Sequence, residues 1–331
     1  MYTPQTFGVA LLMMITSAIC WGSWANTYKG VKNYRFELFY WDYAIGIFLS
    51  TLIYGHTLGM LHDDPTNLIR NLHAGGWDNA IWVVVAGAIF NLANLLLVAA
   101  IDMAGLAIAF PVSIGIALVV GVVSSYALQP KGNAGLLAAG VICALLAVVL
   151  DGKAYGMLSA AGGGADRGLS RKSIVTCVVS GVLMGVWAPF VTKAMTQGHA
   201  LGPYGVAIFL TFGALLSCFI WNIYFMKRPL VGEPVKFGDY FRGPALGHLL
   251  GLLGGCIWGT GMTFNLVAAN YTGVAISYAI GQSAPMVAAL WGVLVWKEFK
   301  GAPAKAYAYL AFMFVFYVIA ILLVARANTA G

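Results

Sequence analysis

One tryptophan-centred stretch occurs twice in this chain, as Ser17-Ala-Ile-Cys-Trp-Gly-Ser-Trp-Ala25 and, 163 residues later, as Ser180-Gly-Val-Leu-Met-Gly-Val-Trp-Ala188. Each copy lies in the first long apolar segment of its half of the chain. A second pair of stretches, 100–110 and 268–278, matches at an offset of 168 residues. Membrane helices rich in Gly, Ala and Trp can resemble one another through composition alone, but two echoes in the same order favour an internal duplication.

The composition indicates a membrane protein. Hydrophobic residues make up 61% of the 331 residues, charged residues make up only 9%, and the mean hydropathy is +0.85. A soluble core of this size cannot hide so much apolar surface. The apolar runs are long and uninterrupted, close to the ~20 residues that a helix needs to cross the hydrocarbon, whereas barrel strands would be short and alternating. We therefore predict an all-α polytopic membrane protein.

Ten membrane-spanning helices are predicted from these runs. They cover residues 7–27, 38–59, 79–101, 105–128, 134–150, 173–194, 203–226, 245–268, 272–296 and 305–326. The duplication then gives a first five-helix repeat (1–150), a linker (151–172) with a small-residue stretch, and a second five-helix repeat (173–331). Since each repeat holds an odd number of spans, the second enters the membrane in the opposite orientation. The expected architecture is a 5+5 inverted repeat.

The basic residues predict the orientation of the chain. Of the 18 Lys and Arg residues, 14 lie in the connectors that follow odd-numbered spans and 4 lie elsewhere. By the positive-inside rule, the odd connectors and the linker are cytoplasmic, and both termini are periplasmic or extracellular. We expect the inner (plasma) membrane. The net charge of +7 is then explained by basic residues in the cytoplasmic connectors. It gives no reason to expect nucleic-acid binding.

The connector 60–78 is predicted to hold a short interfacial helix on the outer side. Asp64 can cap this helix, Pro65 fits its first position, and apolar residues recur on one face between 68 and 72. The helix is either a lid or an amphipathic connector that rests on lipid.

Asp42 is the acid predicted to lie deepest in a span, within Tyr40-Trp41-Asp42-Tyr43. Asp102, Asp151 and Glu298 are expected at span ends. Desolvation by its neighbours would make Asp42 a proton carrier near neutral pH. The alternative is an interfacial aspartate that forms an ion pair with one of the basic residues between 29 and 35.

Uncharged polar and aromatic residues inside the spans form the predicted substrate site. Amide groups can bond the edge of a neutral, hydroxyl-rich solute while indole and phenol rings cover its face. Each such residue could instead tie two helices together or fill space, but the convergence of the set in both halves favours a site. The candidates are Trp24, Asn26, Tyr43, Asn91, Asn94, Trp187, Trp258, Asn265, Tyr278 and Gln282.

Other chemistries lack their motifs in the sequence. No glycine-rich loop ends in Lys-Ser or Lys-Thr, and no Ser/His/Asp or His/Glu cluster indicates an intramembrane enzyme. The five cysteines are far apart within apolar runs, so neither a disulfide framework nor a metal site is predicted. We expect no cofactor and no metal.

The chain resembles the drug/metabolite transporter superfamily. The resemblance rests on the ten-span layout, Trp21-Gly-Ser-Trp24, the basic stretch through Lys32, the hairpin 100–111 and Leu294-Val-Trp-Lys-Glu-Phe299. Within the superfamily it is most similar to the clade of rhamnose/proton symporters, glucose/ribose porters and plant ureide permeases. Asp42-Tyr43 resembles the aspartate-tyrosine pair that opens the second span of ureide permeases.

These observations predict a secondary active transporter that imports a small neutral hydroxylated solute, most simply a monosaccharide, by symport with protons or another cation. The alternatives are a ureide or nucleobase permease, an exporter of drugs or metabolites with an acid deeper in the membrane, and a non-transporting scaffold. Expected partners are the solute, the coupling ion and the lipid bilayer, and the chain is expected to be a monomer or a weak homodimer.

Overall fold

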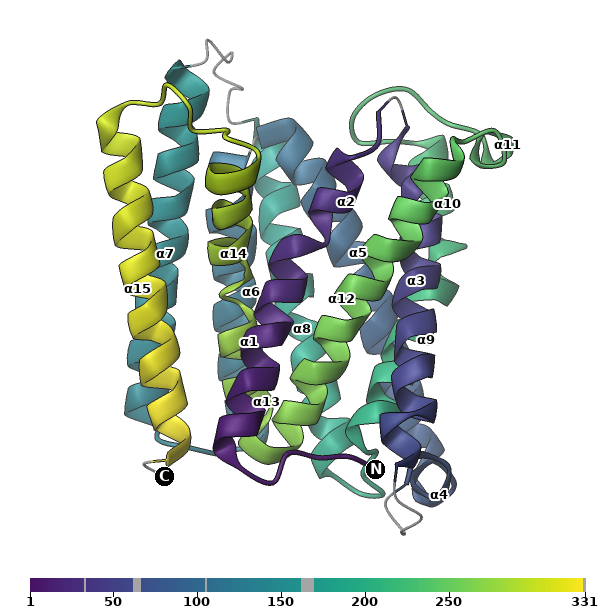
Figure 1. Ribbon diagram of the computed structural model, residues 1–331. Coiled ribbons are helices and arrows are strands. Elements are labelled where there is room, and N and C mark those ends of the chain that lie inside the picture. The colour runs from purple at the N-terminus through teal and green to yellow at the C-terminus, as the bar shows by residue number, and fades with distance from the viewer. Residues whose placement is uncertain (33, 62–66, 105, 162–169, 330–331) are drawn as a thin grey trace.

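The structure, a computed structural model, describes residues 1–331 except 33, 62–66, 105, 162–169 and 330–331. In this part of the chain ten helical segments are long and apolar enough to cross a membrane. They stand side by side in one bundle with both termini at the same end, as an even number of crossings requires (Figure 1). The predicted all-α polytopic fold is confirmed.

Six spans are single helices and four are built from consecutive pieces. The single helices are α5 (Trp77–Ala104), α6 (Leu106–Leu128), α7 (Ala134–Ala161), α8 (Arg171–Thr196), α12 (Ala245–Thr272) and α15 (Ala304–Thr329). The composite spans are α1 (Phe7–Ser23) with α2 (Ala25–Lys29), α3 (Phe36–His56) with the 3₁₀ turn η1 (Leu58–Met60), α9 (Pro203–Cys218) with α10 (Trp221–Lys227), and α13 (Val274–Gly281) with α14 (Ala284–Leu290) and the π-helical turn η2 (Trp291–Val295). Two short helices, α4 (Leu68–Ala74) and α11 (Phe237–Tyr240), lie in connectors.

The fifth span is longer than predicted. Asp151-Gly-Lys153 ends the apolar run, so the sequence suggests a helix end at 150, but α7 continues to Ala161. The helix continues because Ala154 is fully buried and Tyr155 packs on Phe299, with ring centroids 5.1 Å apart. Asp151 therefore lies inside a helix and not at its end. The expected linker 151–172 shortens accordingly, and its residues 162–169 lie outside the described part.

Glycines bring α12 and α3 into close contact. Gly251 faces Asp42, and a Cβ built on Gly251 would lie 2.7 Å from the Cβ of Asp42. A Cβ on Gly255 would collide with the carbonyl oxygen of Tyr43, and one on Gly259 would lie 2.7 Å from the carbonyl oxygen of Ile47. The spacing of four residues thus places one helix backbone against the other.

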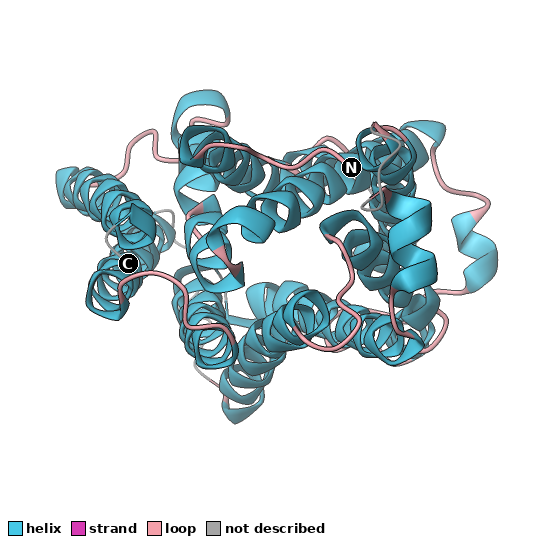
Figure 2. Cartoon of the chain, turned by 90° about the horizontal axis from the view of Figure 1, so that it is seen from below, coloured by secondary structure: helices cyan, strands magenta, loops and turns pink. Residues whose placement is uncertain are grey.

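Helix packing is matched between the two halves. The first span packs on the eighth and ninth spans, and the sixth span packs on the third and fourth. The two copies of the repeated tryptophan stretch also make equivalent glycine contacts. A Cβ on Gly22 would lie 2.6 Å from the Cβ of Val287 in the ninth span, and a Cβ on Gly185 would lie 2.6 Å from the Cβ of Val120 in the fourth span. α7 and α15, the fifth and tenth spans, pack extensively on each other at one edge of the bundle (Figures 1 and 2).

The predicted helix in the connector 60–78 is present as α4, at the end of the bundle that carries the termini (Figure 1). Its N-cap is Asn67, whose side-chain oxygen accepts a bond of 3.0 Å from the backbone N–H of Arg70. Asp64, the predicted cap, and Pro65, the predicted first residue of the helix, lie outside the described residues. Leu68 is buried, whereas Ile69 is exposed.

Candidate functional site

Five aromatic side chains from five spans form a continuous row through the bundle. Trp21 of α1 stacks on Trp258 of α12 at 5.8 Å between ring centroids, and Trp258 stacks on Phe90 of α5 at 4.6 Å. Phe90 meets the edge of Trp187 of α8 at 6.4 Å, and Trp187 meets Tyr278 of α13 at 5.4 Å. We call these five residues the aromatic cluster. It joins the two halves of the chain, because Trp21 and Phe90 come from the first and the others from the second.

Glycines make room for the rings at both ends of the aromatic cluster. A Cβ on Gly281 would lie 2.7 Å from the six-membered ring of Trp21, and one on Gly261 would lie 2.9 Å from Cδ1 of the same indole. A Cβ on Gly121 would collide with the ring of Tyr278. Substitution at these positions must displace an aromatic side chain.

The ninth span is interrupted beside the aromatic cluster. α13 ends at Gly281 and α14 begins at Ala284, so Gln282 and Ser283 lie between the two pieces. Broken helices inside membranes occur where the backbone is buried in protein or lines a cavity, and transporters use them at substrate sites. Gln282, a predicted site residue, lies at this break.

Two buried hydrogen-bond donors in or against the first span lack a partner among the described residues. They are the indole Nε1 of Trp21 and the phenol of Tyr43. Tyr43 packs on Trp24 with ring centroids 4.5 Å apart and on Tyr40 at 5.3 Å. Asn94 donates to the Tyr40 hydroxyl at 3.1 Å. An unpaired buried donor costs free energy, so such groups are candidates for binding a ligand.

Three predicted amides are occupied in joining helices. Asn91 donates to the Ser217 hydroxyl of α9 at 2.8 Å. Asn265 donates to the carbonyl oxygen of Ser277 at 2.9 Å, which ties α12 to α13. Asn26 accepts from Trp296 Nε1 at 2.5 Å near the basic end of the bundle. Their role in substrate binding stays a prediction, and the structure gives each of them a helix-joining role as well.

The C-terminal end of the first span (α1–α2) is bonded to the segment at the C-terminal end of the ninth span. This is the end of the bundle where the basic residues are concentrated. Besides the Asn26–Trp296 bond, Lys29 forms an ion pair with Glu298, and Trp291 Nε1 donates to the Ser23 hydroxyl at 2.9 Å. These contacts close the bundle between α1–α2 and η2 at this end.

Asp42 lies 8% exposed in the first half of α3, and both of its carboxylate oxygens have partners. The Tyr240 hydroxyl donates to Oδ1 at 2.7 Å, and His248 Nδ1 lies 2.7 Å from Oδ2. Two of the three basic residues expected as alternative partners are engaged elsewhere, since Lys29 pairs with Glu298 and Arg35 with Glu37. Asp42 is therefore held by a phenol and an imidazole.

The two tyrosines beside Asp42 stay protonated. Burial, the hydrogen bond to Asp42 and the charge of that carboxylate raise the pKa of Tyr240 above its usual range. Burial and the Asp42 charge likewise raise the pKa of Tyr34 to about 12. The phenol of Tyr240 is thus a donor to Asp42 at physiological pH. The sequence prediction missed Tyr240 and His248, and its one available signal was a histidine within the predicted span 245–268.

A second acid, Asp151, lies within a spanning helix and is only 4% exposed. Asp151 was predicted at the end of a span; it lies inside its helix because α7 is longer than the ~20 residues that a crossing needs. In the described part of the chain, no group of three or more His, Cys, Asp or Glu side chains is placed to hold a metal ion.

A bundle of ten membrane-spanning helices with a broken span and buried polar groups at its centre defines a membrane transporter. The sequence profile of the ureide permease family matches residues 39–162 and 172–326. The chain belongs to the ureide permease family, whose members are transporters and not enzymes. The specific kinship with rhamnose symporters and glucose porters is not among these matches.

Curated relatives agree with this assignment, and a solved structure shares the fold. The chain is 22% identical over 384 aligned positions to Ureide permease 1 of Arabidopsis thaliana, covering 97% of each protein. It is 24% identical over 406 positions to Ureide permease 5 of Arabidopsis thaliana, covering 99% of this chain and 96% of that protein. These alignments are longer than the 331 residues of this chain, so both relatives carry residues that it lacks. A solved crystal structure shares the fold with a TM-score of 0.63 and 19% identity over 96% of this chain and 98% of that one.

Proposed function

We propose that this chain is a secondary active transporter of a planar, neutral, hydrogen-bonding solute of the ureide class, and that the solute binds at the aromatic cluster beside the break at Gln282. The observation that carries the proposal is a pair of buried, unpartnered donors: Trp21 Nε1, whose ring lies against Gly281 at the break, and the Tyr43 hydroxyl, whose ring packs on Trp24 of the same span as Trp21.

The chemistry of this place fits such a solute. A urea group offers a carbonyl oxygen, which accepts from indole N–H and phenol O–H donors, and N–H groups, which donate to amide oxygens such as that of Gln282. Its flat framework can lie against an indole face. The proposal also draws on the relatives, which are named ureide permeases.

A monosaccharide, the solute predicted from the sequence, is the second candidate. The stacked indoles of Trp21 and Trp258 would suit the apolar face of a sugar ring, and the same donors would bond its oxygens. The two candidates differ in shape, since a sugar ring is puckered and a ureide or nucleobase is flat.

A thermal-shift screen with purified protein separates the candidates. Ureides, nucleobases and monosaccharides are added singly to the wild type and to Trp21→Phe, which keeps an aromatic ring but removes Nε1. Stabilisation by a ureide that is reduced in Trp21→Phe supports the proposal. Stabilisation by monosaccharides alone supports the second candidate, and stabilisation by neither class contradicts both.

Transport by alternating access between two inverted repeats is part of the proposal. The matched packing of the two halves and the equivalent contacts of Gly22 and Gly185 support it. We assign the first repeat to α1–α7 and the second to α8–α15, joined by a linker at the basic end. The contacts between Lys29, Asn26 and Ser23 and the region of η2 would then close the cytoplasmic path in this conformation.

Proton coupling through Asp42 is likewise proposed, with His248 and Tyr240 as its partners. A carboxyl beside an imidazole can exchange a proton as the gate moves, and protonation shifts the conformational equilibrium only by its different affinity for the two states. The excess of Lys and Arg at the end opposite the termini supports a cytoplasmic location for that end.

Import is the proposed direction, and export is the alternative. An exporter is expected to carry an acid deep in the membrane, and the position of Asp151 within α7 does not fix its depth. Uptake in oriented proteoliposomes, with the solute placed first outside and then inside, distinguishes the two directions.

A further inference from the structure

Asp151 lies about two-thirds of the way along α7, on the face that packs against α15. Its Oδ1 atom is buried without a hydrogen-bond partner among the described residues. The hydroxyl of Tyr317 in α15 is buried in the same condition, and the Asp151 carboxylate is near enough for its charge to act on Tyr317 and on Tyr155, one turn further along α7. Asp151 and Tyr317 are thus two buried polar groups of the same interface, and no hydrogen bond joins them.

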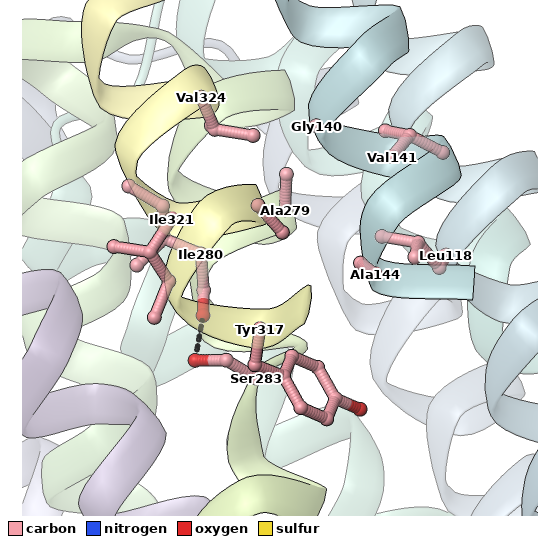
Figure 3. Close-up of a pocket in the computed structure, with 11 residues that line it drawn as sticks. Leu118, Gly140, Val141, Ala144, Ala279, Ile280, Ser283, Tyr317, Ile321 and Val324 are labelled. Atoms are coloured by element: carbon pink, nitrogen blue, oxygen red, sulfur yellow. Dashed lines mark hydrogen bonds between the residues drawn. The ribbon is translucent and has the colours of Figure 1, made fainter. Parts of the chain in front are cut away.

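Tyr317 also forms one end of a small cavity between α7, α13 and α15. Figure 3 shows its hydroxyl pointing away from the Ser283 hydroxyl, which donates to the carbonyl oxygen of Ile280 at 2.7 Å. The cavity has a volume of about 10 Å³ and its lining is mostly apolar, with residues such as Leu118 and Val141. This is the lower limit for a single water molecule. The cavity cannot hold a solute, and it leaves the Tyr317 hydroxyl without a partner on that side.

No neighbouring basic side chain among the described residues neutralises the negative charge of the Asp151 carboxylate. Among the described residues, no Lys, Arg or His nitrogen lies within ion-pair distance of its carboxylate. Lys153 is exposed and lies over the ring of Tyr309, 5.8 Å from its centroid. The nearby acid Glu298 is paired with Lys29 and accepts from the Tyr155 hydroxyl at 3.5 Å.

An isolated carboxylate buried within a membrane span is unstable, whereas a neutral carboxyl is tolerated because it can donate a hydrogen bond. A metal cation would need several more oxygen ligands than this interface offers. A proton needs only one carboxylate oxygen, and the neutral carboxyl that results requires no counter-charge.

We propose that Asp151 is a second proton-binding site, at the α7–α15 interface and separate from the Asp42 site, and that its carboxyl holds a proton in this conformation. The bond that forms is O–H on the carboxylate, and the proton comes from water. The site does not depend on the identity of the solute.

Infrared spectroscopy of the full chain in lipid nanodiscs tests the proposal. At neutral pH the wild type should show the C=O absorption of a protonated carboxyl that shifts in deuterated water. Asp151→Asn should lose this absorption, and the matched control Asp78→Asn, at an exposed acid in the first turn of α5, should keep it. Tyr317→Phe should shift the position of the absorption, because it removes a polar O–H group near the carboxyl while keeping the ring.

Three results would overturn the proposal. The first is the absence of a protonated-carboxyl absorption in the wild type, and the second is its persistence in Asp151→Asn. The third is a thermal stabilisation by sodium or potassium ions that Asp151→Asn abolishes, which would make the site a metal-cation site. If Asp151→Asn does not fold, Asp151→Glu and Tyr317→Phe must each move the absorption, and an unmoved band in both contradicts the assignment.

Discussion

His248 Nδ1 lies 2.7 Å from Oδ2 of Asp42, although 206 residues separate them in the chain. The contact crosses from α3 to the start of α12, at the place where Gly251 lets the two helices approach. Tyr240 completes the arrangement by donating to the other carboxylate oxygen. Among the described residues, the Asp42 carboxylate of the first half is hydrogen-bonded only to side chains of the second half, so a relative movement of α3 and α12 changes its surroundings.

Asp42→Asn should lose proton-driven accumulation of solute while retaining exchange without a pH gradient. Asparagine fits the space and accepts the bond from Tyr240, but it cannot take up the proton. His248→Gln should have the same effect if carboxylate and imidazole act together. The measurement is uptake into proteoliposomes under an imposed pH gradient, beside counterflow exchange.

His56→Gln is the matched control for the imidazole, because His56 is exposed on α3 and contacts only the Leu52 carbonyl oxygen among the described residues. Undiminished concentrative uptake by Asp42→Asn would remove Asp42 from the coupling mechanism. Loss of exchange and of binding as well would instead make Asp42 a solute contact.

Trp21→Phe and Tyr43→Phe should weaken solute binding. Each change removes one buried donor that has no partner in the structure, so the solute loses a hydrogen bond worth ~0.5–1.5 kcal/mol, or roughly a 2- to 10-fold rise in Kd. The melting temperature of solute-free Tyr43→Phe should stay the same or rise, because an unsatisfied polar group is gone, whereas Trp21→Phe also loses part of its stack on Trp258 and should melt lower.

Tyr204→Phe provides the opposite pattern as a control. The Tyr204 hydroxyl donates to the carbonyl oxygen of Tyr2 at 3.0 Å, so its removal should lower stability and leave Kd unchanged. Normal binding by both Trp21→Phe and Tyr43→Phe would show that the solute binds elsewhere.

A single cysteine at position 3 or 329 should react with an impermeant thiol reagent added outside intact cells, whereas one at position 170 should not. Thr3 and Thr329 lie near the termini, and Ser170 caps the start of α8 at the opposite end of the bundle. The excess of basic residues at that end predicts that it is cytoplasmic. Background labelling is measured on the wild type, whose five native cysteines lie within spans. Labelling at 170 but not at the termini would reverse the orientation.

Hydropathy predicted the spans because burial in lipid imposes a long apolar run on every crossing helix. It misplaced the end of α7, because a charged pair such as Asp151 and Lys153 ends an apolar run without ending a helix. The partners of Asp42 could not be predicted from the sequence either. Tyr240 lies in a connector 198 residues away, and no local pattern shows which connector folds back onto which span.

The predicted solute-binding residues likewise include some that the sequence pattern could identify and some whose role depends on contacts between distant segments. The tryptophans could be grouped because Trp24 and Trp187 occupy equivalent places in a repeated stretch. Phe90 was missed, since a phenylalanine in an apolar helix carries no signal of its own. The amides of Asn91 and Asn265 could not be distinguished from solute contacts, because helix joining and solute binding use the same chemistry.

Gly255→Ala should destabilise the protein and reduce transport, because the added methyl group must push α12 away from α3. A Cβ at this position would collide with the Tyr43 carbonyl oxygen and lie 2.8 Å from the Ile47 nitrogen, and neither backbone atom can move aside. Forcing a methyl group into packed backbone costs ~1–3 kcal/mol, and the separation also disturbs the Asp42–His248 contact one turn away. Gly8→Ala is the control, since it too lies in a helix but has nothing within 4 Å of its Cβ position. Thermal unfolding in detergent and uptake at fixed pH gradient are measured for both. Equal melting temperatures for the two variants would mean that α3 and α12 are not in backbone contact at Gly255.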